Sequence, residues 1–141
     1  ELVLRFFAAK DYQEQFKGSV SDWLDSYMEK ILLHDAPFDF EAQAAIFNSV
    51  FDVLNEKFGS NAFVKYRNGK PMGGVAPAYF EAVSMAAMAQ LDNLRAKAPV
   101  DAIAALAGAV ESAEFRAVTG PGANSLPKLV KRIEIVSQAF Q

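Results

Sequence analysis

The sequence contains no cysteine and only one histidine, His34. Without cysteine the chain has no disulfide, no thiolate nucleophile and no cysteine-ligated zinc or iron–sulfur cluster. A single imidazole is too few for a histidine-based metal site, and a Ser-His-Asp triad would have to use His34. We expect His34 to be a surface residue near the end of a helix, where a cation is favourable, and we expect no metal and no cofactor.

Long apolar runs and a large excess of one charge are also missing. No hydrophobic stretch approaches the roughly 18–20 residues that cross a bilayer, and no signal peptide is recognisable, so we expect a cytoplasmic protein without membrane contact. The net charge is −3, from 14 Lys and Arg against 17 Asp and Glu, which gives no overall basic field for nucleic acid. The phosphate-binding patterns G-x-x-x-x-G-K-[ST] and G-x-G-x-x-G do not occur.

Phenylalanine is the residue that stands out among those present. The chain has 12 Phe, 4 Tyr and 1 Trp in 141 residues, and 52% of its residues are hydrophobic. This length fits one domain, and this composition is too apolar for a disordered chain. We therefore expect a single domain with a core rich in phenylalanine.

The spacing of apolar residues predicts an all-α fold, a single bundle of about six helices. Ser19 or Ser21 is expected to cap the second helix and Asp39 the third, and Gly59 is a candidate left-handed stop. The predicted helices cover residues 2–10, about 20–33, 40–58, 78–95, 100 to about 113, and 126–140.

One long connection, Gly59 to Pro77, interrupts the helical pattern. It is rich in glycine and proline, and Asn68-Gly69 is a strong turn dipeptide. Pro71 makes the residues after the turn a poor strand, because proline cannot donate to a ladder. We expect an ordered loop, with a minor hairpin as an open alternative.

Charge is unevenly distributed along the chain. Residues 11–56 carry a net charge of −8, residues 57–70 carry +4, and residues 115–141 carry +3. The acidic residues Asp22, Asp25 and Glu29 are expected on a solvated helix face rather than in acid–base catalysis. The basic residues can contact nucleic acid, although cations on an amphipathic helix are more often only its solvated side. The candidates for nucleic-acid contact are Lys65, Arg67, Lys70, Lys128, Lys131 and Arg132.

Several short motifs carry a resemblance to a known family. They are Glu-Leu-Val-Leu-Arg-Phe-Phe-Ala at residues 1–8, Tyr12, Phe-Lys-Gly-Ser at 16–19, Trp-Leu at 23–24, Tyr-Met-Glu at 27–29, and looser pieces at 58–63, 79–83, 115 and 131–133. In this order they resemble the helical region of the bacterial ParB/sulfiredoxin-like family that includes the S part of glucosyl-modified-cytosine restriction enzymes. Trp23 departs from that pattern, where phenylalanine is more frequent.

The resemblance implies a helical region without catalytic residues. In that family a ParB-like α/β domain with an Asp-Gly-Gln-Gln-Arg-type motif, linked to nucleotide hydrolysis, precedes this region, and some members add an HNH-type nuclease domain. Neither motif occurs in this sequence, so no catalytic residue is carried over. The chain opens without an initiator methionine, and we expect a fragment of a longer protein that lacks its ParB-like domain.

The main hypothesis is an accessory helical domain of a ParB-like defence or restriction-type protein. It would pack on the ParB-like domain through Leu2, Val3, Phe6 and Phe7, and would help to position DNA or a partner subunit. Arg5 is expected to be a buried ion pair or hydrogen-bond anchor against that domain, with direct nucleotide contact as the other possibility. One alternative is a self-standing nucleic-acid-binding module that uses the basic segments 57–70 and 116–132. A second is a small-ligand sensor with a pocket among the phenylalanines.

Overall fold

Helices make up 71% of the chain, which a computed structural model describes for all residues from Glu1 to Gln141. The all-α class is confirmed, with a two-stranded hairpin as the only sheet. The α-helices are α1 (Leu2–Asp11), α2 (Val20–Leu32), α3 (Phe40–Phe58), α4 (Pro77–Ala89), α5 (Leu91–Ala96), α6 (Pro99–Glu111), α7 (Ala113–Ala117) and α8 (Leu126–Phe140). The strands are β1 (Lys65–Arg67) and β2 (Lys70–Met72), and single 3-10 turns cover Gln13–Gln15 and Gly59–Asn61.

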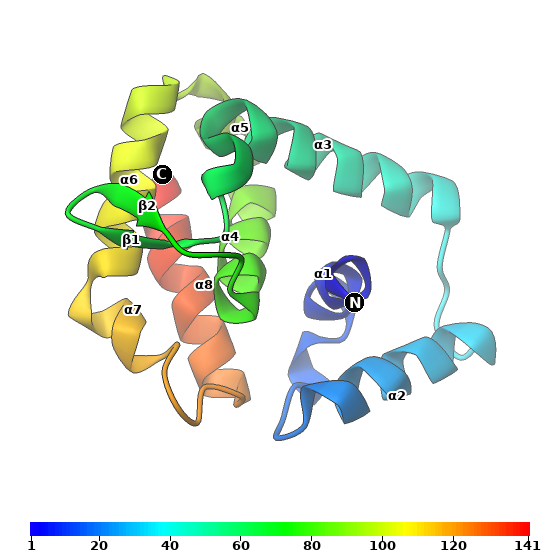
Figure 1. The fold of residues 1–141 in the computed structure, drawn as a ribbon. Coiled ribbons are helices and arrows are strands. Elements are labelled where there is room, and N and C mark those ends of the chain that lie inside the picture. Colours follow the sequence, from blue (N-terminus) through cyan, green and yellow to red (C-terminus); the bar gives the residue numbers. More distant parts are fainter.

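The helix α4 is the centre of the bundle. Every residue from Tyr79 to Ala87 is buried, as expected for a helix that is apolar around its whole circumference. Helices α8, α1 and α3 all contact it, and α8 runs alongside it over most of its length (Figure 1). Small residues in α4 allow these neighbours to approach closely, so this helix connects the two sides of the molecule.

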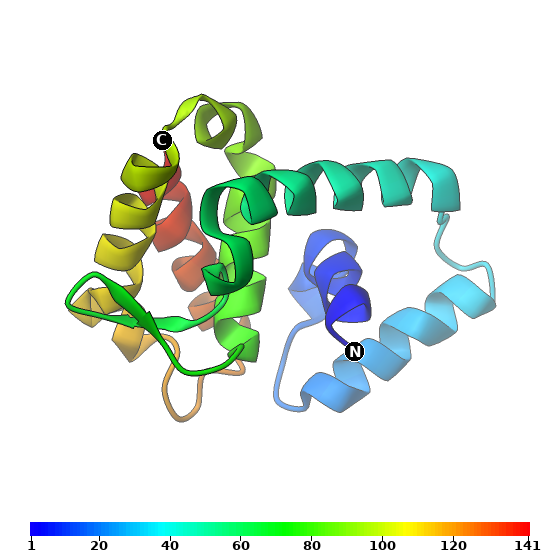
Figure 2. The same ribbon diagram turned by 45° about the horizontal axis from the view of Figure 1, so that its top comes forward.

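The two sides of the molecule are joined across the top by the long helix α3. Helices α6, α7 and α8 and the hairpin lie on one side of α4, and α1 and α2 lie on the other (Figure 1). The C-terminal part of α3 contacts α4 and α6, and its N-terminal part extends over α1 (Figure 2). The α3 residues Phe47 and Phe51 pack edge-on against Phe6 of α1 at 5.3 and 5.6 Å between ring centroids.

One of the predicted helices is interrupted and one short helix, α7, was not predicted, which gives eight α-helices instead of about six. Gln90 has φ −115° and ψ 32°, so the expected helix 78–95 divides into α4 and α5. The break lets α5 turn back against α3 and buries Leu94 completely. Ser112 is extended, and its side chain accepts a hydrogen bond from the Phe115 amide at 3.1 Å, so the separate helix α7 begins after it.

Local stop and start signals lie where the sequence predicts them. Of the two serines considered, Ser19 caps α2, where it accepts a hydrogen bond from the Asp22 amide at 3.2 Å. Asp39 caps α3 by accepting from the Ala42 amide at 3.1 Å, and Gly59 follows α3 with φ +55°. These contacts satisfy amides of the first turn that have no partner within the helix.

The connection between α3 and α4 contains a small hairpin, which the sequence indicated as an alternative to an ordered loop. Asn68 and Gly69 have φ +53° and +74°, the left-handed pair that closes a type I′ turn. Lys65 pairs with Met72 and Arg67 with Lys70. Pro71 is tolerated because β2 is an edge strand. No helix combines the length and apolar character that crossing a membrane requires.

Candidate functional site

A buried group of ionic side chains lies where α1, α4 and α8 meet. Oε1 of Glu81 accepts a hydrogen bond from Nη1 of Arg5 at 2.7 Å, and Oε2 of the same carboxylate accepts from Nη2 of Arg132. Glu81 and Arg132 each have 1% of their surface exposed, and Arg5 is also buried. One carboxylate of α4 therefore holds one arginine from each end of the chain.

The two arginines have further partners that fix them in place. Nη1 of Arg132 donates to the carbonyl oxygen of Ala123 at 2.8 Å, and its guanidinium lies 5.6 Å from the ring centroid of Phe16. Nη2 of Arg5 donates to Oε1 of the exposed Glu1 at 2.6 Å, and this contact lowers the pKa of the Glu1 carboxyl. With both carboxylates ionised, the four side chains have no net charge.

This network changes two of the predictions made from the sequence. Arg5 is buried and ion-paired as expected, but its partner is Glu81 of the same domain, so it is not free to anchor a second domain. Arg132 is too deeply buried to contact a nucleic-acid phosphate. The cause is the same for both, because a buried guanidinium needs a counter-charge, and the fold supplies Glu81 internally.

The apolar residues of α1 divide between the core and the surface. Phe6 has no exposed surface and belongs to the core, so it cannot pack on another domain as predicted. Val3 is 56% exposed, Leu2 is also exposed, and Phe7 is half-buried. The outer face of α1 thus keeps three of the four apolar residues that the sequence assigned to an interface.

Val3 and Phe7 line one side of an open hollow of about 340 Å³, which we call the aromatic groove. Its other walls come from α3 and the connection before it, with Phe38, Phe40 and Phe47 as the main residues. The Phe38 ring centroid lies 5.3 Å from that of Phe7 and 4.8 Å from that of Phe40. We define the groove by these five side chains.

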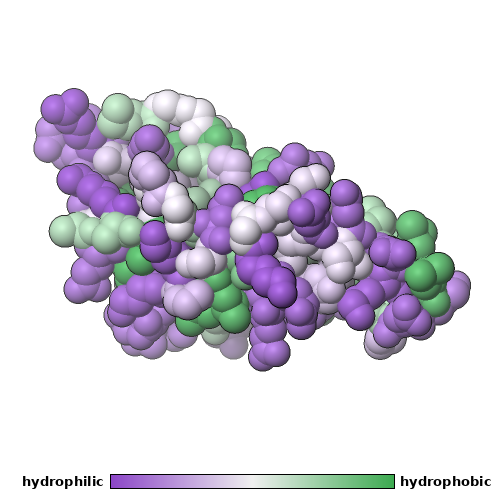
Figure 3. Space-filling model, turned by 90° about the horizontal axis from the view of Figure 1, so that it is seen from below, coloured by the Kyte–Doolittle hydropathy of each residue, from purple (hydrophilic) through white to green (hydrophobic).

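The apolar surface continues past the groove to the end of α2. A second hollow, of about 330 Å³, shares Phe38 and Phe40 with the groove and adds Ile31 and Leu32. Seen from below, hydrophobic surface gathers at the right-hand end of the molecule, over the end of α2 and the connection to α3 (Figure 3). His34 lies here, exposed and with φ +58°, so it is the surface residue near a helix end that the sequence predicts.

The predicted nucleic-acid residues fall into three groups. Lys65 and Arg67 of β1 and Lys70 of β2 are exposed and form no ion pair within the chain. On α8, Lys131 pairs with Glu134 at 3.3 Å, and Nζ of Lys128 donates to the Gly122 carbonyl at 3.0 Å. With Arg132 buried, α8 has no continuous basic face.

The two basic segments meet at one place. Lys65 and Arg67 line a hollow of about 520 Å³ together with Arg116 of α7, and no carboxylate lines it. Lys57, which was counted in the first segment, is instead buried beneath α5, where its Nζ donates to the Arg95 carbonyl at 3.1 Å. The free cations are therefore concentrated around the hairpin and α7.

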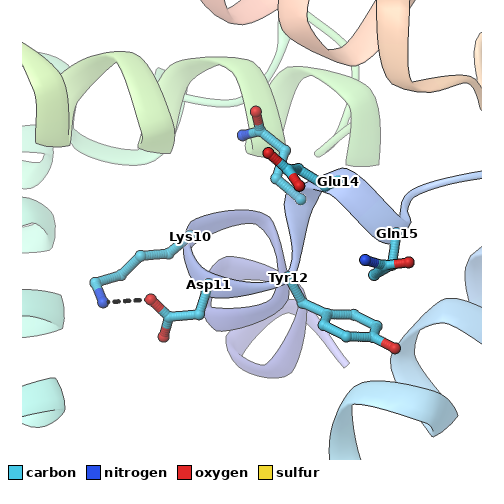
Figure 4. A pocket seen from close by; sticks show the side chains of 6 residues that line it. Lys10, Asp11, Tyr12, Glu14 and Gln15 are labelled. Atoms are coloured by element: carbon cyan, nitrogen blue, oxygen red, sulfur yellow. Dashed lines mark hydrogen bonds and ion pairs between the residues drawn. The ribbon is translucent and has the colours of Figure 1, made fainter. Parts of the chain in front are cut away.

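Another hollow lies at the end of α1 and is lined by the consecutive residues 10–15 (Figure 4). Its one cation, Lys10, pairs with its neighbour Asp11 at 2.7 Å, and the Tyr12 hydroxyl lies 2.8 Å from Oγ of Ser26. Tyr27 nearby donates to Oδ2 of Asp11 at 3.3 Å, and burial together with that carboxylate raises the pKa of the phenol. These contacts join the end of α1 to α2.

Acidic side chains do not converge on any point of the structure. Asp22, Asp25 and Glu29 are all exposed on α2, which agrees with the solvated face that the sequence predicts. No group of three or more His, Asp or Glu side chains has a geometry that could hold a metal ion.

Comparisons with known proteins identify no relative of this chain. No family model matches the sequence, and neither a curated protein nor a solved structure gives a significant match.

Sequence reasoning missed three features of these surfaces. Glu81 had a usable signal, because it is the one charged residue in the otherwise apolar helix α4. Phe38 and Phe40 flank Asp39 beside Pro37, where no helical periodicity draws attention to them. Arg116 was counted within a basic segment, but only the fold places it beside Lys65 and Arg67.

Proposed function

We propose that the chain is a non-catalytic helical accessory domain of a ParB-like defence or restriction-type protein, and that the ParB-like domain docks on the aromatic groove. The observation that carries this proposal is the exposure of the groove, since Phe40 is 74% exposed and Val3 beside it is 56% exposed. Contiguous apolar surface of this kind commonly marks a site of protein association. Docking there would help to position DNA or a partner subunit relative to the ParB-like domain.

The charge around the groove restricts what can dock. Asp35, Asp39 and Glu41 are exposed on the connection and the first turn of α3, and residues 11–56 carry a net charge of −8. An occupant that matches this surface has an apolar centre and basic residues around it, because like charges at the rim oppose association. We therefore expect Lys or Arg residues on the docking face of the ParB-like domain.

The fold supports a fixed docking surface rather than an adaptable one. One wall of the groove belongs to α1, and the pairing of Arg5 with Glu81 attaches α1 to the central helix α4. The other wall is held by Phe47, whose ring stacks on Phe51 at 4.1 Å. A surface already in its bound arrangement loses less conformational entropy when a partner binds.

The test is a titration with a ParB-like domain taken from a protein in which that domain directly precedes the same opening motif. We expect the amide signals of residues in the groove to shift in NMR spectra of the labelled chain. Phe40→Ser should weaken binding strongly, because it removes a central apolar contact. Val100→Ser is the matched control, since Val100 is 72% exposed on α6, far along the chain from the groove.

Three outcomes would overturn the proposal. The first is the absence of binding, and the second is equal weakening by Phe40→Ser and Val100→Ser. The third is self-association of the isolated chain, measured by sedimentation, that Phe40→Ser abolishes; the groove would then be an interface between two copies.

A further inference from the structure

The hollow between the hairpin and α7 combines positive charge with an absence of negative charge. Lys65, Arg67 and Arg116 line it, and none of the three has a carboxylate partner within the chain. Glu111 follows the lining residue Val110 but does not itself line the hollow; its Oε2 accepts a hydrogen bond from the Gly69 amide at 3.1 Å, and Glu114 forms no ion pair with Arg116. The protein as a whole has a net charge of −3, so this positive charge is confined to one part of its surface.

The fold brings these cations together from distant parts of the chain. Lys65 and Arg67 are two positions apart on β1, so they lie on the same face of the strand, while Tyr66 between them is buried. The Tyr66 hydroxyl donates to the Asn61 carbonyl at 3.0 Å, which holds β1 in place. Arg116 is presented by α7, which begins at the Ser112 cap. The three cations therefore lie on segments, β1 and α7, that hydrogen bonds hold in place.

Hydroxyl groups complete the wall of the hollow. Tyr79 and Thr119 line it, and Thr119 donates to the Phe115 carbonyl at 2.9 Å. A tyrosine phenol keeps its proton at neutral pH, and burial raises the pKa of Tyr79 further, so this hydroxyl can donate a hydrogen bond. The Thr119 hydroxyl hydrogen is used in its bond to Phe115, which leaves Tyr79 as the free hydroxyl donor. Guanidinium groups that line one space with such a donor are typical of sites that bind phosphate groups.

We propose that this hollow, of about 520 Å³, binds the phosphate group of a phosphate ester, with Lys65, Arg67 and Arg116 neutralising its charge. Such an ester is carried by a free nucleotide or by the backbone of a nucleic-acid strand. The proposal does not depend on the aromatic groove, because the hairpin and α7 lie on the opposite side of α4 from α1 and α2 (Figure 1).

The experiment measures binding of three probes to the whole chain at low salt: inorganic phosphate, ATP, and a single-stranded oligonucleotide. We expect saturable binding, with NMR shifts at Lys65, Arg67 and Arg116, and displacement of the larger probe by phosphate. Tighter binding of ATP than of the oligonucleotide would assign the site to a free nucleotide. Tighter binding of the oligonucleotide, with a salt slope of about 0.7 per phosphate contact, would assign it to a strand.

Neutralising variants make the proposal falsifiable. Arg67→Gln and Arg116→Gln should each weaken binding about tenfold, because each removes a charge-assisted contact. Both side chains are exposed and form no contact that the fold needs, and circular dichroism checks that the helices are unchanged. The control is Lys131→Gln, an exposed cation on α8 outside the hollow. No binding of any probe, or equal weakening by Lys131→Gln, would overturn the proposal.

Discussion

Glu81 and Arg5 are separated by 76 positions in the sequence, yet Oε1 of the glutamate lies 2.7 Å from Nη1 of the arginine inside the protein. Arg132 occupies the other oxygen of the same carboxylate. Such a network adds little stability over an apolar replacement, but breaking it leaves a buried charge without a partner. Because each oxygen of Glu81 binds one arginine, one from α1 and one from α8, we infer that the network helps to set how these helices sit against α4.

We predict that Glu81→Gln lowers the free energy of unfolding by about 3–5 kcal/mol, because both arginines lose their buried counter-charge. Urea denaturation measures the change. Glu134→Gln is the control, since Glu134 forms an exposed pair with Lys131 and its loss should cost at most about 1 kcal/mol. Equal effects of the two variants would show that the buried network contributes no more than a surface pair.

We predict that the free energy of unfolding falls as the pH rises above about 10. The pKa of Tyr27 is raised in the folded state, chiefly by burial, so above the unfolded pKa the unfolded chain binds fewer protons and stability declines. Tyr27→Phe should reduce this decline. Denaturation at about pH 8 and about pH 11 measures it, and an unchanged slope in the variant would assign the decline to other groups.

We predict that Asp39→Ala lowers the free energy of unfolding by about 1 kcal/mol, since Asp39 accepts the hydrogen bond of the Ala42 amide at the start of α3. Asp39→Asn should retain most of the stability, because asparagine is an equally good N-cap. The same denaturation curves test both variants. If both lose the same amount, the charge of Asp39 matters and the cap does not.

We predict opposite effects for alanine at two glycines. Gly69→Ala should destabilise the protein by about 1–2 kcal/mol, because φ is +74° there and an L side chain is strained. Gly108→Ala should stabilise it by about 1 kcal/mol, because Gly108 lies within α6 and an added Cβ meets nothing within 4 Å. Thermal unfolding of both variants shows whether each one is more or less stable than the original protein. A destabilising Gly108→Ala would contradict the expectation that alanine is favoured within α6.

The helix pattern could be predicted because it depends on residues close together in the chain. Ser19, Asp39 and Gly59 mark helix ends through contacts within one turn, and Asn68-Gly69 closes its hairpin locally. The breaks at Gln90 and before α7 could not be predicted in this way. Glutamine is compatible with a helix, and the turn exists because Leu94 is buried against the rest of the core.

The candidate surfaces depended far more on tertiary structure. Lys131 and Arg132 are adjacent in the sequence, but one is exposed and the other is 1% exposed beside Glu81. Phe6 and Phe7 are likewise adjacent, and only Phe7 lines the aromatic groove. Helical periodicity indicates which residues share a face of a helix. It does not indicate which face is covered by a segment from a distant part of the chain.

The sequence by itself determined the helical class, the helix caps, the turn of the hairpin and the uneven distribution of charge. Only the tertiary structure decided that Arg5 and Arg132 share one buried carboxylate, and that Arg116 lines one hollow with Lys65 and Arg67. The reason is physical. Backbone hydrogen bonds and capping act over a few residues, whereas desolvation and ion pairing depend on which distant side chains packing brings together.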